Sequence, residues 1–381
     1  MIAYNLQPIA VRGLTGIGNY TAQVARRLID KDSELHAFDF LGRNGAWGIL
    51  EENLQMDLSG NDLHIVRSLP LSVYIRMGSA GKVIPYKTLT HSGADLTVFF
   101  NYLTPGGLTG KNIITIYDLV SERFPETMQA RNRRLLQGHL KDSASRASAV
   151  LTISEFSKRE IIDVLGVPEE KIFVGYCGVD TEYYTPGKGF TTGIDKKFGL
   201  ESYILYVGTL EPRKNIKTLV EAYGLIADKF PDIKLVLAGG LGWQPGETLS
   251  AIENSPYSDR IVRCGYVSNE EKRDLLRNAR VFCFPSIYEG FGMPVTEAMA
   301  CGTDCIVSDS SSLTEIAGDL LYKIDPGDVD GWAQALQAKL SSPMSEDRAK
   351  ALRAKAETYT WEQAAAAAHN AIEFANYGII K

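Results

Sequence analysis

Short apolar runs alternate with longer amphipathic stretches along most of the chain. Stretches with apolar positions every three or four residues predict helices, notably over residues 129–147 and 154–165. Strands that alternate with helices indicate an α/β fold with a mainly parallel sheet. The apolar runs of the first half predict strands at residues 1–4, 35–40, 63–66, 96–100, 113–117 and 149–153.

The same alternation restarts after a stretch rich in Gly, Pro and Thr at residues 185–193, which predicts a domain boundary. We therefore expect domains at residues 1–185 and 186–361. Capping-box patterns precede two helices, from Ser268 to Glu271 and from Thr360 to Gln363, and the second helix is expected to run to about residue 376. Strands of the second series are predicted at residues 203–208, 234–238, 260–263, 281–284 and 304–307.

Length, charge and cysteine content limit the class of protein and its partners. A length of 381 residues suits two domains. The net charge of −6 arises in the second half and no domain is basic, so we expect no nucleic-acid partner. Five cysteines, an odd number, and the lack of a leader-like start predict a reducing, cytoplasmic location. No apolar run reaches the roughly 18 residues that span a bilayer.

One stretch, residues 63–94, contains no acidic residue and mixes basic with aromatic and apolar side chains. Such a patch suits an anionic membrane surface or a lipid-linked anionic substrate. The alternative is a solvated loop combined with core residues. The basic members are Arg67, Arg76, Lys82 and Lys87, and the others are Tyr74, Ile75, Met77, Ile84 and Tyr86.

Two places in the first half contain residues that suit a ligand-binding site. Ligands of parallel sheets bind beyond the carboxyl ends of the strands, where Tyr117 and Asp118 follow a predicted strand. Asp118 alternatively caps the next turn. Gly16 and Gly18 lie between the opening strand and a helix, but the third glycine of a dinucleotide fingerprint is replaced by Thr21, so a tight turn is an equal interpretation.

The connection after residues 281–284 has the features of an anion site. Gly290 and Gly292 precede Pro294, which fits the first turn of a helix. Backbone amides at a helix start bind anions, and the helix dipole favours negative charge there. Glu289 and Glu297 flank this turn and are suitable acceptors for sugar hydroxyls. The alternative is an ordinary strand–loop–helix connection.

Two adjacent cations, Arg213 and Lys214, follow the first strand of the second domain, after Gly208. Arg can bind two phosphate oxygens at once, while Lys acts as a point charge. This loop and the loop after residues 281–284 open on the same edge of one parallel sheet. Together they match a sugar nucleotide, a diphosphate with hydroxylated rings at both ends. An exposed basic turn is the alternative.

These stretches resemble retaining glycosyltransferase family 4. The spacing of Glu289 and Glu297 matches the family's Glu-x7-Glu signature, and residues 211–215, 154–158 and 178–180 match further family stretches. The chain is also similar to bacterial mannosyltransferases of O-antigen and exopolysaccharide synthesis. The resemblance implies the GT-B fold: two Rossmann-like domains with a central cleft, and a final helix, about residues 362–381, that packs on the first domain.

The resemblance also implies roles for particular residues. Many family members have His where this chain has Tyr117, and a neutral Tyr is a poor proton acceptor. Arg213, Lys214, Glu289 and Asp118 are the expected catalytic residues, and Tyr117 and Asp118 the expected acceptor contacts. The expected donor-binding residues are Gly16, Gly18, Gly208, Thr209, Arg213, Lys214, Glu289, Gly290, Phe291, Gly292, Met293, Pro294 and Glu297.

The implied activity is transfer of a hexose, most simply mannose from GDP-mannose, with retention and without a metal ion or cofactor. A saccharide or an undecaprenyl-diphosphate-linked glycan is the expected acceptor, and peripheral association with the inner face of the plasma membrane is expected. A UDP-sugar remains an alternative donor. Alternatives of another class are an NAD-dependent oxidoreductase and a non-catalytic sugar-nucleotide-binding protein.

Overall fold

The computed structural model describes residues 1–42, 45–79 and 84–378. The chain divides into two compact units. Unit 1 comprises Met1–Glu122, Ala130–Cys177 and Trp361–Lys381, and unit 2 comprises Arg123–Gln129 and Gly178–Thr360. The division therefore falls before the Gly/Pro-rich stretch at 185–193. The amide of Val179 donates to the carbonyl of Tyr359, 3.1 Å away, which ties residues at both edges of unit 2 to each other.

Unit 1 is built on a parallel sheet in which strand order is β3-β2-β1-β4-β5-β6-β7 within the described residues. Both faces are covered, so most strands are buried throughout and appear in the sequence as continuous apolar runs. The strands are β1 (Ile2–Asn5), β2 (Glu34–Phe38), β3 (Asp62–Val66), β4 (Leu96–Phe99), β5 (Lys111–Thr115), β6 (Ala149–Thr152) and β7 (Ile172–Val174).

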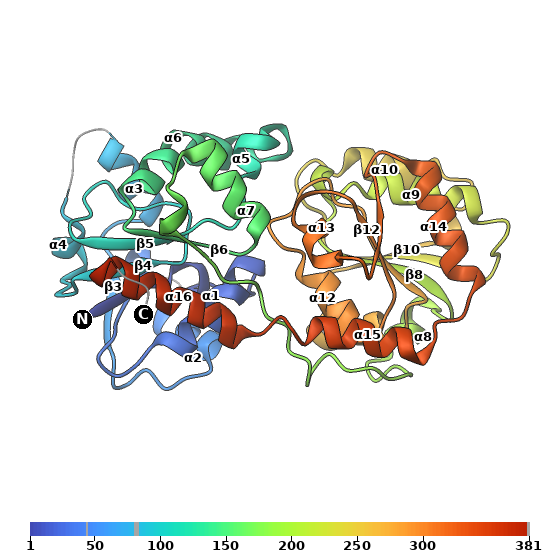
Figure 1. Ribbon diagram of the computed structural model, residues 1–381, viewed down its shortest axis with the longest axis horizontal. Coiled ribbons are helices and arrows are strands. Elements are labelled where there is room, and N and C mark those ends of the chain that lie inside the picture. Colours follow the sequence, from blue (N-terminus) through green and yellow to red (C-terminus); the bar gives the residue numbers. More distant parts are fainter. Residues whose placement is uncertain (43–44, 80–83, 379–381) are drawn as a thin grey trace. The chain divides into compact units, whose positions relative to one another are not determined.

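The final helix packs on unit 1, as the family resemblance predicts (Figure 1). It contacts α1 and the strands β5, β6 and β7. Arg27 and Glu362 form an ion pair of 2.8 Å between α1 and this helix. A Cβ on Gly175 would lie 3.1 Å from the carbonyl oxygen of Ala364, so this glycine permits the close approach. The helices that contribute to unit 1 are α1 (Gly16–Leu28), α2 (Ala46–Leu54), α3 (Leu71–Ser79), α4 (Tyr86–Thr90), α5 (Val120–Arg123), α6 (Ala130–Arg146), α7 (Glu155–Glu160) and α16 (Trp361–Tyr377).

Unit 2 has its own parallel sheet, in the order β10-β9-β8-β11-β12-β13 within the described residues. Together with unit 1 it confirms the prediction of two Rossmann-like parts. Its strands are β8 (Tyr203–Val207), β9 (Lys234–Ala238), β10 (Ile261–Gly265), β11 (Val281–Phe284), β12 (Cys305–Ser308) and β13 (Tyr322–Ile324). Its helices are α8 (Ile194–Phe198), α9 (Ile216–Ile226), α10 (Gly246–Glu253), α11 (Asn269–Asn278), α12 (Met293–Ala300), α13 (Ser311–Ala317), α14 (Val329–Ser341) and α15 (Glu346–Ala356).

Two predictions at helix starts can be compared with the structure, one before α11 and one at α1. The predicted capping box before α11 forms, because Ser268 Oγ accepts from the amide of Glu271 and the Glu271 carboxylate accepts from the amide of Ser268. Of the two interpretations of Gly16 and Gly18, the tight turn does not hold. Both glycines lie in the first turn of α1, which Thr15 caps by accepting from the amide of Gly18 at 3.4 Å.

The segment without acidic residues is divided between core and surface. Tyr74, Ile75 and Tyr86 are buried in the hydrophobic core of unit 1, whereas Arg67 and Arg76 are exposed. Lys82 lies outside the described residues. The aromatic part of the segment is thus core, and a membrane-facing role stays a prediction. Within the described residues, no helix has the length and apolar character needed to cross a bilayer.

Candidate functional site

The loop after β8 is shaped by two glycines that meet at neighbouring strand ends. Gly208 and Gly239 adopt φ values of +153° and +150°, at the carboxyl ends of β8 and β9. A Cβ on Gly239 would lie 1.9 Å from the carbonyl oxygen of Gly208, so only glycine fits. The amide of Gly208 donates to the carbonyl of Ala238 at 2.9 Å and joins the two loops. The structure places Thr209 in this loop with its side chain exposed.

Asn215 connects the Arg213–Lys214 turn to other loops of unit 2. It adopts the left-handed conformation (φ +53°) directly before α9. Its side-chain amide donates to the carbonyls of Pro285 (3.1 Å) and Pro326 (2.7 Å). The amide of Ile287 donates to the carbonyl of Arg213 at 2.9 Å. These contacts fix the basic turn against the loop that follows β11.

Three consecutive serines after β12 hold the loop that contains Glu289. Ser310 donates to the carbonyl of Ile287 at 2.9 Å. Ser311 Oγ accepts from the amide of Glu289 at 2.9 Å, and Ser312 donates to the carbonyl of the same residue at 2.9 Å. The sequence reasoning missed these serines. Three serines next to the end of a buried strand were the available signal.

Arg213, Lys214 and Glu289, three of the predicted catalytic residues, form one ion cluster in unit 2. Lys214 Nζ lies 2.5 Å from Glu289 Oε1, and an Arg213 guanidinium nitrogen lies 3.0 Å from Glu289 Oε2. The other end of Arg213 pairs with Glu211 at 3.0 Å. Each of these side chains is less than a quarter exposed. The cluster therefore holds both cations in fixed positions at the carboxyl edge of the sheet.

Burial and charge oppose each other at this cluster. Burial by itself would raise the pKa of Glu289, but the charges of Lys214 and Arg213 and the hydrogen bond from Lys214 lower it to about 2. Burial lowers the pKa of Lys214, and the nearby charge of Arg213 lowers it further, while Glu289 opposes both effects. The carboxylate is thus ionised near neutral pH and helps to keep the ammonium group charged.

The start of α12 lies beside the cluster in sequence. Gly292 precedes the helix with φ +116°, and a Cβ there would lie 2.8 Å from a methyl group of Leu313. Pro294 occupies the first turn, as predicted. The amides of Gly290 and Gly292 make no hydrogen bond to the described part of the chain. They remain available to an anion at a helix start.

Glu297 and Phe291 have partners that the sequence did not reveal. Lys272 donates to Glu297 Oε1 at 2.8 Å, while Oε2 is buried and has no hydrogen-bond partner within 3.5 Å among the described residues. Burial raises the pKa of Tyr184, and the charge of Glu297 raises it further. The ring of Phe291 packs edge-on against Tyr359 at 5.5 Å, and the side chain of Met293 is partly exposed.

Tyr117 and Asp118, two of the predicted residues of unit 1, lie beyond β5. Tyr117 is 3% exposed; its hydroxyl donates to the carbonyl of Phe100 at 3.2 Å and lies 3.3 Å from Thr21 Oγ1. Burial raises the pKa of Tyr117, which makes its hydroxyl a poorer acid. Asp118 is half-buried and accepts from the hydroxyl of Tyr102 at 3.1 Å. Tyr117 therefore has a structural contact, and its contact with an acceptor stays a prediction.

Comparisons with known proteins agree with this architecture. Residues 14–183 match the family described as Glycosyltransferase Family 4, and residues 193–358 match Glycosyl transferases group 1. O-antigen chain mannosyltransferase B of Escherichia coli is 29% identical over 372 residues, which cover 92% of this chain and 93% of that protein. O-antigen chain mannosyltransferase RfbU of Salmonella typhimurium is 30% identical over 225 residues, 59% of each chain.

Solved structures show the same fold at low identity. Sucrose-phosphate synthase from Thermosynechococcus elongatus aligns with a TM-score of 0.73 at 19% identity, and the alignment covers 99% of both chains. Anabaena Alr3699/HepE, solved in complex with UDP-glucose, aligns with a TM-score of 0.71 at 16% identity and covers 98% of this chain and 99% of that chain. These structures share the two-unit fold of this chain, and the two family matches define the protein as a glycosyltransferase.

Within that class, residues 14–183 match glycosyltransferase family 4 and residues 193–358 match glycosyl transferases group 1, so both parts of the chain match glycosyltransferase families. The family resemblance predicted from the Glu289–Glu297 spacing is confirmed. The oxidoreductase alternative loses its support, since both matched families are glycosyltransferases.

Proposed function

We propose that this protein transfers mannose from GDP-mannose to a hydroxyl of a saccharide acceptor, with retention of the anomeric configuration. The observation that carries the proposal is the cluster of Arg213, Lys214 and Glu289 at the carboxyl edge of the unit 2 sheet. The donor is further supported by the similarity to O-antigen mannosyltransferases. A lipid-linked glycan is the acceptor class that we propose on the same grounds.

The cluster suits a diphosphate leaving group. Among the described residues, Lys214 Nζ makes one hydrogen bond, to Glu289, so two of its three protons remain for phosphate oxygens. Free amides at Gly290 and Gly292 add donors at the start of α12. Because negative charge grows on the diphosphate as its bond to the sugar breaks, such fixed donors stabilise the transition state more than the ground state.

Glu297 is proposed to hold the ribose. Its Oε2 is buried and has no hydrogen-bond partner within 3.5 Å among the described residues, so a ligand hydroxyl there would supply a favourable hydrogen bond. Its Oε1 is fixed by Lys272, so the carboxylate has a defined orientation before the nucleotide arrives. This division of roles agrees with the site assignments that the family resemblance implies.

The proposed step is a substitution on one face of the sugar. The bond from the anomeric carbon to the β-phosphate oxygen breaks with both electrons on that oxygen. The acceptor hydroxyl oxygen forms the new bond on the same face, and its proton passes to the departing phosphate. The products are a glycoside and a nucleoside diphosphate. Asp118 is proposed to orient the acceptor hydroxyl, and no metal ion is needed because cations and amides neutralise the leaving group.

The test is incubation of the full chain with radiolabelled GDP-mannose, UDP-glucose and UDP-galactose, each with a lipid-linked saccharide acceptor. We expect label in the acceptor and release of GDP only with GDP-mannose, and an axial linkage by NMR. Transfer from a UDP-sugar alone would overturn the donor assignment. A trapped glycosyl–enzyme adduct would exclude the same-face step. Binding of the nucleotide without turnover would favour a non-catalytic role.

A further inference from the structure

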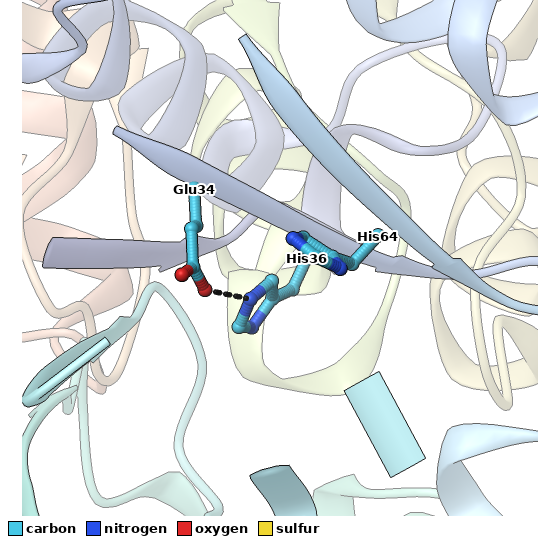
Figure 2. A group of neighbouring side chains, drawn as sticks. All are labelled: Glu34, His36 and His64. Carbon is cyan, nitrogen blue, oxygen red and sulfur yellow. Dashed lines mark hydrogen bonds and ion pairs between the residues drawn. The ribbon is translucent and has the colours of Figure 1, made fainter. Parts of the chain in front are cut away.

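A second cluster of titratable side chains lies in unit 1, between strands β2 and β3. Glu34 and His36 are two residues apart on β2, so they share one face of the strand. His64 is the direct cross-strand partner of His36 in the parallel pair. One ligand atom from each of these side chains lies within 4.8 Å of the other two. Figure 2 shows the carboxylate of Glu34 directed at the ring of His36, with His64 on the neighbouring strand.

The buried charge of Glu34 has no cationic partner among the described residues. Glu34 and His36 are 3% and 0% exposed. Glu34 accepts hydrogen bonds from Ser92 (2.5 Å) and from the amide of Gly93 (3.0 Å), and its Oε2 lies 3.3 Å from His36 Nε2. Buried charges in proteins are paired or coordinate metals. A bound cation would compensate this carboxylate.

His64 supplies an independent observation. Its Nε2 is buried and has no hydrogen-bond partner within the described residues. The ring stands edge-on to His36, with ring centroids 5.4 Å apart. A buried ring nitrogen without a partner loses its hydrogen bond to water and gains nothing in return. Coordination of a metal ion would give this nitrogen the partner that it lacks.

The far side of His36 is arranged as metal-binding histidines usually are. His36 Nδ1 lies 3.0 Å from the hydroxyl of Tyr86, which also accepts from the side-chain amide of Asn5 at 3.1 Å. A carboxylate only accepts, so in the metal-free chain the proton lies on Nε2 and faces Glu34. On metal binding this proton would move to Nδ1, where the Tyr86 hydroxyl can accept it, and Nε2 would become a ligand.

We propose that Glu34, His36 and His64 form a Zn²⁺ site that joins β2 to β3. Two imidazoles and a carboxylate suit Zn²⁺, and a water molecule would occupy the fourth position. Ideal tetrahedral geometry places ligand atoms about 3.3 Å apart, and those of this cluster lie within 4.8 Å of one another, so the side chains close by up to about 1.5 Å on binding. Glu34 is at the amino end of β2, whereas ligands of parallel sheets bind at carboxyl ends. The metal would therefore lie away from the sheet edge where ligands bind, and its role is separate from the proposed transfer.

The test measures zinc bound to the full chain after chelator treatment, reconstitution with Zn²⁺ and removal of unbound metal. We expect one zinc per chain, and a rise in Tm of about 5 °C when free Zn²⁺ is about 100-fold above its Kd. His64→Phe retains an aromatic ring and Glu34→Gln retains the shape of the side chain, yet both remove a ligand and should lose the metal. His369→Asn, on the exposed face of α16, should retain it.

Two readouts do not depend on the variants folding. X-ray absorption of the reconstituted wild-type protein should show nitrogen and oxygen ligands with two imidazoles, and Co²⁺ should give the visible absorption of a tetrahedral site. Zinc bound with one imidazole or none, no zinc bound to the wild-type chain, or zinc that persists in both folded ligand variants would each overturn the site.

Discussion

Lys214 and Glu289 are joined by an ion pair of 2.5 Å although 75 residues separate them. Lys214 follows β8 and Glu289 follows β11, and these two strands are neighbours in the unit 2 sheet. The parallel topology therefore brings a cation and a carboxylate from distant sequence to one sheet edge. Each residue changes the pKa of the other. Mutation of either residue, or a change of pH, therefore tests the role of the pair.

Replacement of Lys214 tests the proposed stabilisation of the leaving group. Lys214→Gln removes a charged donor from the diphosphate, and we expect turnover to fall about 10²–10³-fold. Steady-state kinetics with the radiolabelled donor measure this. Lys217→Gln is the matched control, because Lys217 is an exposed lysine at the start of the same helix, α9. Equal turnover of wild type and Lys214→Gln would contradict the role.

The pKa of Glu289 predicts acid sensitivity of unit 2. Its pKa is about 2 in the folded chain against an ordinary value of 4.5, so its ionised form stabilises the fold above pH 4.5. This stability is lost as the pH falls from 4.5 to 2. The shift corresponds to about 3 kcal/mol. Urea unfolding across this pH range should show that the stability difference between wild type and Glu289→Gln shrinks with acidification; a constant difference would exclude the linkage.

Gly292 is predicted to be irreplaceable at the start of α12. Gly292→Ala places a Cβ at φ +116° and 2.8 Å from Leu313, so we expect a loss of about 1–3 kcal/mol in the free energy of unfolding. Transfer activity should fall with it, because the loop carrying Glu289 shifts. Thermal and urea unfolding measure the first effect.

Gly224→Ala is the control for that substitution. Gly224 lies within α9, has no positive φ, and a Cβ there meets nothing within 4 Å. Alanine should stabilise this position by about 0.5–1 kcal/mol. If both substitutions destabilised the protein equally, the backbone argument for Gly292 would fail.

Asp274 is predicted to hold the Gly/Pro-rich stretch at 185–193 in place. This fully buried carboxylate accepts from the amides of Thr191 (2.6 Å) and Thr192 (2.9 Å) and from the Thr192 hydroxyl (2.9 Å). Asp274→Ala should cost about 3 kcal/mol of stability and speed proteolysis within the stretch. Limited proteolysis with mass spectrometry of the fragments locates the cut. Asp274→Asn keeps one acceptor oxygen and should be intermediate, whereas unchanged cleavage in both variants would refute the tether.

Much of the fold could be predicted from the sequence, because most strands are buried on both faces and appear as continuous apolar runs. The predictions at 234–238 and 281–284 coincide with β9 and β11. The sequence missed β7 and β13, which have three residues each and are too short for a periodic signal. Boundaries at strand ends shifted by one or two residues, as for β5, where Ile116 and Tyr117 leave the strand.

Local features of the sequence also explain which residues of the candidate site were predicted and which were missed. Arg213, Lys214 and Glu289 were found because strand ends and helix starts are local features with a known place in parallel sheets. Lys272, Asn215 and the serines of α13 were missed because their contacts exist only in the folded chain. The burial of Tyr117 against Tyr20 and Tyr102 is likewise a tertiary fact that no local pattern contains.

The return of α16 to unit 1 sets the order in which the protein matures. Residues 1–177 leave the ribosome first, yet α1 and β6 stay uncovered until Trp361–Tyr377 has been made. The main part of unit 2, Gly178–Thr360, is synthesised in the interval and can fold before α16 has been made. The part that is translated first is therefore finished last, and a nascent chain stalled before residue 361 should present apolar surface to chaperones.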